Sequence, residues 1–117
     1  MLGRNVKVFA PIVLMLLAAS VMAGEETWKG ASLVDTMCSA KLNKDSADTH
    51  TTSCAIQCAK GGYGIYTSDG TYLKFDETGN KKTLALLKAT KKTDHLRATV
   101  VGERDGETIK VKSLSLD

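Results

Sequence analysis

Two Asp-Gly pairs, each flanked by β-rich segments, and a short leucine-rich helix between the resulting hairpins predict a mixed α+β protein that is mainly β. The first hairpin spans 63–76 with its turn at Asp69-Gly70, and the second spans 95–116 with its turn at Asp105-Gly106. Asp-Gly favours the tight turn that joins neighbouring antiparallel strands. Another strand is expected at 27–35, where a glycine between apolar residues favours a bend or a bulge.

Two helical segments are predicted around these strands. One is the short helix at 80–89, and the other is a helix at 47–59 with its N-cap at Asp48 or Thr49. The complete order is then strand, helical insertion, two strands, helix, two strands. This is the order of a five-stranded Greek-key barrel of the OB type. An open α+β sheet with both helices on one face is the alternative.

The first 23 residues have the organisation of a secretory signal peptide. Arg4 and Lys7 precede an apolar run, and Ala23 suits a signal-peptidase site. We expect cleavage near Ala23, a signal peptide at 1–23, a single OB-like domain at 24–117, and a periplasmic or secreted protein. Because the apolar run is shorter than the roughly 20 residues of a spanning helix, no membrane span is expected after cleavage.

The charge of the chain argues against a nucleic-acid partner. Its formal net charge is +3, but removal of Arg4 and Lys7 with the signal peptide lowers this to +1. A domain this close to neutral lacks the basic surface that binds a phosphate backbone.

The stretch from His50 to Gly62 raises the main functional question. His50, Cys54 and Cys58 recur every four residues, so in a continuous helix they would project from one side. Thiols of an exported domain favour disulfides. Cys54 and Cys58 would have parallel side chains, which leaves Cys38 as the partner of one of them. We expect Cys38 to pair with Cys54, with Cys58 as the alternative, and one thiol to remain free.

The same residues also suit a metal site. Cys38, His50, Cys54 and Cys58 form a Cys3His set that could bind Zn²⁺, or Cu(I) through fewer thiolates, with Asp35 as an orienting carboxylate. The spacing matches no common zinc finger. The remaining alternative is that these side chains only pack the helix.

Four aromatic residues of the first hairpin form a candidate binding face, because OB folds bind ligands in this region. They are Tyr63, Tyr66, Tyr72 and Phe75. The competing interpretation is that the rings fill a small barrel, and the near-neutral charge favours it.

Several short motifs resemble a group of small exported bacterial proteins with OB-like folds. They are Trp28-x-Gly30, Asp35-x-x-Cys38, His50 followed by Cys54-x-x-x-Cys58, Val100-x-Gly102, Asp105-Gly106 and Ile109-x-Val111. The resemblance covers nearly all of the chain after the signal peptide and implies an OB-like fold and export. It assigns no catalytic residue.

No paired carboxylates, Ser-His-Asp set or phosphate-binding glycine loop indicates an enzyme. We therefore expect a non-enzymatic binding module with no cofactor, whose insertion is held by a disulfide and whose ligand is an envelope molecule or protein. A metal-binding or thiol-redox protein is the alternative.

Overall fold

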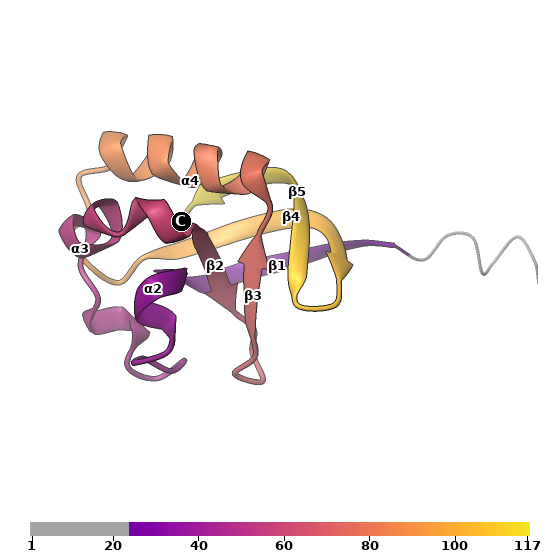
Figure 1. Ribbon diagram of the computed structural model, residues 1–117, viewed down its shortest axis with the longest axis horizontal. Helices are drawn as coiled ribbons and strands as arrows, with labels where there is room; N and C mark the ends of the chain where they lie inside the picture. Colours follow the sequence, from indigo (N-terminus) through magenta and orange to yellow (C-terminus); the bar gives the residue numbers. More distant parts are fainter. Residues whose placement is uncertain (1–23) are drawn as a thin grey trace, which may run out of the picture.

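The computed structural model of the protein describes residues 24–117, and the predicted signal peptide lies outside the described residues (Figure 1). Five strands form a closed barrel in the order β1-β2-β3-β5-β4. They are β1 (Glu25–Asp35), β2 (Tyr63–Tyr66), β3 (Tyr72–Phe75), β4 (Arg97–Asp105) and β5 (Thr108–Leu116). β3 and β5 are parallel, whereas the other neighbours are antiparallel. This is the predicted OB-type barrel, and the closure excludes the open sheet.

β1 is bent, as its glycine predicted. Its pairing with β4 shifts register between Trp28 and Ala31, and Gly30 between them has a φ of 58°. Glycine adopts this left-handed conformation without the steric cost of a Cβ atom. The bend allows one strand to pair with β4 along its first part and with β2 along its last four residues.

The helix α4 (Glu77–Ala89) connects β3 to β4 and lies across the barrel (Figure 1). It begins three residues before the predicted start because Asp76 caps it. Asp76 Oδ1 accepts hydrogen bonds from the backbone N–H of Gly79 at 3.0 Å and of Val111, in β5, at 3.3 Å. A Cβ atom on Gly79 would lie 2.5 Å from Val111 Cγ2, so the first turn of α4 packs closely on the barrel.

The insertion between β1 and β2 consists of four short pieces: α2 (Thr36–Ser39), η2 (Ala47–Thr49), α3 (Thr52–Gln57) and η3 (Ala59–Gly61). The single helix expected at 47–59 is therefore wrong. His50 is extended, with ψ 131°, and Thr51 caps α3 by accepting the N–H of Cys54 at 3.1 Å. The cap starts a new helix after His50, so this residue does not share a helical face with Cys54 and Cys58.

Apolar side chains fill the barrel and attach the insertion to it. Leu33, Ile65, Leu73, Val100 and Ile109 meet Leu87 of α4 in the main core. A second cluster of Val34, Ala47 and Tyr66 holds the insertion against the strands. No helix within residues 24–117 is long and apolar enough to cross a membrane.

Candidate metal centre

A buried carboxylate lies where the barrel meets the insertion. Asp35 is the last residue of β1, and its side chain is fully buried. It is also the N-cap of α2, since its Oδ2 accepts the N–H of Cys38 at 3.0 Å. The cap orients the four-residue helix and brings the Cys38 side chain back toward the end of the strand.

His50 reaches the same carboxylate from the other side of the insertion. Its Nε2 lies 2.5 Å from Asp35 Oδ1, and its side chain is 9% exposed. The following residue, Thr51, caps α3, and Thr52 anchors that helix by bonding the carbonyl oxygens of Lys92 and Thr93. These contacts fix the extended backbone that directs the imidazole inward.

Asp35, Cys38 and His50 together offer a carboxylate oxygen, a sulfur and an imidazole nitrogen. The three ligand atoms lie within 4.8 Å of one another. Oxygen, sulfur and nitrogen donors of these types bind zinc, and a thiolate with an imidazole suits copper as well. The residues fit a transition metal in chemistry and in proximity.

The structure separates one of the three cysteines in the predicted Cys3His set from the other two. Cys38 lies 4.1 Å from Cys58, at the end of α3, while Cys54 is exposed and lies outside the three-donor group. All three cysteines, which are the cysteines of residues 24–117, are free thiols. The expected pairing of Cys38 with Cys54 stays a prediction, but the side chain beside Cys38 is the alternative partner, Cys58.

The surroundings of Cys38 keep its thiol protonated. Burial raises the pKa of Cys38 to about 11, and the negative charge of Asp35 and a hydrogen bond to it act in the same direction. Reactive cysteines need the opposite environment, because the thiolate is the nucleophile. The site is therefore poorly arranged for a catalytic cysteine. A bound cation would instead offset the charge of Asp35 and that of the thiolate which Cys38 becomes on binding it.

The aromatic residues of the first hairpin are mostly buried. Tyr63 and Phe75 belong to the main core, and Tyr66 packs beneath the insertion. Tyr66 Oη donates toward the carbonyl oxygens of Ser39 and Leu42 at 2.7 and 3.0 Å. Tyr72 is half-buried, and its Oη donates to the carbonyl oxygen of Val34 at 2.9 Å. The four rings mainly fill the barrel and fasten the insertion, and of the four only Tyr66 also lines the groove beside β1.

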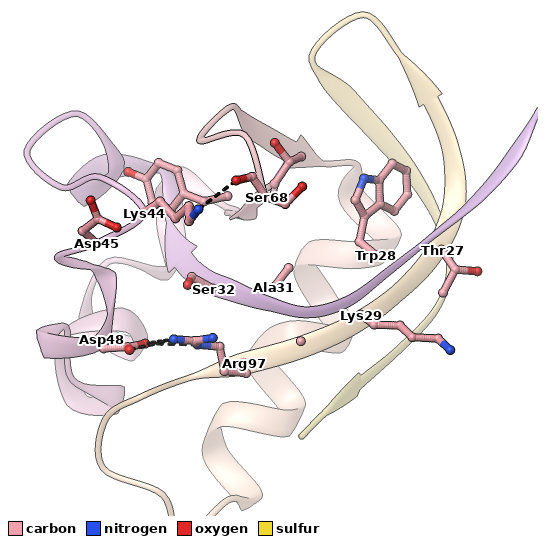
Figure 2. Close-up of a pocket in the computed structure, with 13 residues that line it drawn as sticks. Thr27, Trp28, Lys29, Ala31, Ser32, Lys44, Asp45, Asp48, Ser68 and Arg97 are labelled. Carbon is pink, nitrogen blue, oxygen red and sulfur yellow. Dashed lines mark hydrogen bonds and ion pairs between the residues drawn. The ribbon is translucent and has the colours of Figure 1, made fainter.

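An open groove of about 480 Å³ lies beside the bend of β1. Trp28 projects into it, and Lys44 donates to the carbonyl oxygen of Ser68 across it at 2.8 Å (Figure 2). At another edge, Arg97 makes a two-pronged ion pair with Asp48 at 2.7 and 2.8 Å. Sequence reasoning placed Trp28 in a bent strand but did not identify a groove, since the lining comes from four separate segments.

No family model matches the chain, and neither the curated proteins nor the solved structures searched contain a match. The barrel agrees with the fold that the resemblance to exported OB-like proteins implied, and no family match supports the resemblance further.

Proposed function

We propose that this small β-barrel protein binds a transition-metal ion, Zn²⁺ or copper, through Asp35, Cys38 and His50. The observation that carries the proposal is the convergence of three different donor atoms within 4.8 Å at a largely buried place. Two segments supply these donors, and both are held by side-chain caps. Such support fixes ligands in the way that metal sites require.

Metal binding would exchange protons for the ion. A thiolate and a neutral imidazole are the forms that coordinate metal, so ligand protons leave as the ion enters. The cation then takes the place of the proton in the hydrogen bond that joins Asp35 to His50. Without metal, the hydrogen bond between these side chains satisfies both of them.

The test uses reduced, chelator-treated protein expressed from the full sequence. Zn²⁺ and Cu(I) are titrated in competition with a chromophoric chelator, and we expect one ion per chain. Cys38→Ser and His50→Gln should each lower the affinity at least tenfold. Cys54→Ser is the matched control, because that cysteine is exposed and outside the donor group. Failure to compete with the chelator, or an equal loss in Cys54→Ser, contradicts the proposal.

A second function, the binding of a short glycan, is favoured by the groove beside β1. OB barrels bind oligosaccharides, and sugars stack on an aromatic ring while polar groups bond their hydroxyls. Trp28 is the only tryptophan of the chain, so its fluorescence reports on this groove directly. Titration with short soluble oligosaccharides should shift its emission. Calorimetric titration of the variants, which lack this fluorophore, should show that Trp28→Phe retains binding and that Trp28→Ala loses it. An unchanged emission with every oligosaccharide contradicts this function.

A further inference from the structure

Cys38 and Cys58 form a pair of thiols next to the proposed metal ligands. Cys38 lies in α2 and Cys58 lies at the C-terminal end of α3, so two separate pieces of the insertion bring them within 4.1 Å. Both side chains are half-buried, whereas Cys54, one turn earlier in α3, is exposed. Cys58 lies outside the three-donor group, and Cys38 is the one residue that the group and the pair share.

The pair is placed for disulfide formation. A disulfide joins sulfurs at about 2.05 Å, so the two side chains, now 4.1 Å apart, need to move closer before they can bond. Both residues are half-buried, and neither is enclosed in the core, so the pair is open to a small oxidant.

We infer that Cys38 and Cys58 form an oxidisable dithiol whose disulfide excludes the metal from the site. This inference rests on the proposed function, because it gives Cys38 two alternative roles. As a thiolate, Cys38 completes the metal site with Asp35 and His50. As half of a disulfide, its sulfur carries no negative charge and no longer binds the ion.

The oxidation needs a two-electron acceptor, and a small-molecule disulfide such as oxidised glutathione supplies it. The Cys58 thiolate attacks a sulfur of glutathione disulfide, which releases one glutathione thiolate and leaves a mixed disulfide on Cys58. Cys38 then gives up its proton as it attacks the Cys58 sulfur of that mixed disulfide, and the second glutathione is released. The protein loses two electrons and two protons, which appear in the two molecules of reduced glutathione. Any bound ion loses its sulfur ligand and leaves.

The experiment combines metal release with disulfide mapping. The zinc-loaded full-length protein is placed in glutathione redox buffers of increasing oxidised fraction, together with a chromophoric zinc indicator. Reduced glutathione in the buffer reverses mixed disulfides on single cysteines. We expect zinc release to follow the appearance of a Cys38–Cys58 cross-linked peptide, and at least a tenfold lower zinc affinity in the oxidised protein.

Two cysteine variants separate the possible outcomes. Cys58→Ser retains Asp35, Cys38 and His50, so it should bind zinc and resist release in the same buffers. Cys54→Ser should release zinc as the unsubstituted protein does. Retention of zinc by the cross-linked protein, equal release from Cys58→Ser, or a cross-link of Cys38 to Cys54 would overturn the inference.

The reduced protein distinguishes failure of the inference from failure of the proposed function. If the reduced protein binds neither Zn²⁺ nor Cu(I), then the proposed metal function is wrong and the exclusion fails with it. If the reduced protein binds zinc and oxidation does not displace it, only the further inference is wrong.

Discussion

Asp35 is the most deeply buried of the three candidate metal ligands. Its carboxylate is fully buried, and its two oxygens bond His50 Nε2 and the N–H of Cys38. A buried carboxylate that loses a partner keeps the cost of its desolvation without the compensating bond. This single side chain therefore connects the stability of the insertion to the chemistry of the candidate metal centre.

Loss of the imidazole should destabilise the protein even without metal. We expect His50→Ala to lower the free energy of unfolding by about 2–3 kcal/mol, because it leaves the buried Asp35 carboxylate short of a partner. Urea denaturation in the presence of chelator measures this change. The control is His95→Asn, since His95 is exposed and asparagine tolerates its φ of 50°. An equal effect of the two substitutions would refute the structural role of His50.

At the scale of elements, side-chain caps determine where the helices begin. Asp35, Thr51 and Asp76 each accept the backbone N–H of the third residue of the helix that follows. Asp76 also bonds the N–H of Val111, so the same carboxylate joins α4 to β5. Capping therefore contributes to tertiary structure here as well as to the individual helices.

Removal of the α4 cap should have a larger effect than removal of a neighbouring charge. We expect Asp76→Ala to cost about 1–2 kcal/mol, as substitutions at N-caps do. Glu77→Ala is the control, because the ion pair of Glu77 with Lys81 is exposed and contributes about 0.5 kcal/mol or less. Thermal unfolding of the two variants compares the effects, and similar melting temperatures would contradict the double role of Asp76.

An ion pair between the insertion and β4 gives stability that depends on pH. The hydrogen bonds from Arg97 hold the pKa of Asp48 below its ordinary value of 3.8. A carboxyl whose pKa is depressed by folding adds stability above its unfolded pKa and loses it as pH falls through the folded pKa. The side chains are 28% and 42% exposed, so the contribution is ~0.5–1 kcal/mol.

Asp48→Asn should accordingly destabilise the protein at pH 7, and this effect should shrink as the pH falls from 3.8 to 2, because Asp48 takes up a proton over this range. Denaturation at pH 7 and near pH 2 measures the difference. Asp45→Asn, in the same loop, serves as the control because Asp45 is exposed. A loss of the same size at both pH values would show that charge is not the source.

At the scale of the whole molecule, local signals were enough to predict the barrel. Asp69-Gly70 and Asp105-Gly106 each act within a few residues, and both turns join adjacent strands. The arrangement of the site residues could not be predicted in the same way, because it depends on which residue caps α3. The sequence placed the N-cap at Asp48 or Thr49, whereas the structure places it at Thr51, which leaves His50 outside the helix and directed toward Asp35. Periodicity cannot reveal such a choice, because it assumes that the helix continues.

We expect the exported protein to begin at Gly24. The prediction rests on the sequence of residues 1–23, whose charged start, apolar run and small residue before position 24 suit signal-peptide cleavage. Intact mass and N-terminal sequencing of the protein from the cell envelope or medium measure it. Recovery of protein that still begins at Met1 would contradict export by cleavage.

The pairing of β1 with β4 has a consequence for the order of folding. β1 pairs with β4, with Glu25 opposite Glu103, so β1 cannot complete its pairing until the fourth of the five strands has been made. Contacts so distant in sequence form slowly, because a long loop must close before they contribute. The partners at the insertion are much closer, since Asp35 and His50 are separated by 15 positions in the sequence. The contacts around His50 and the cysteines can therefore form before the barrel closes.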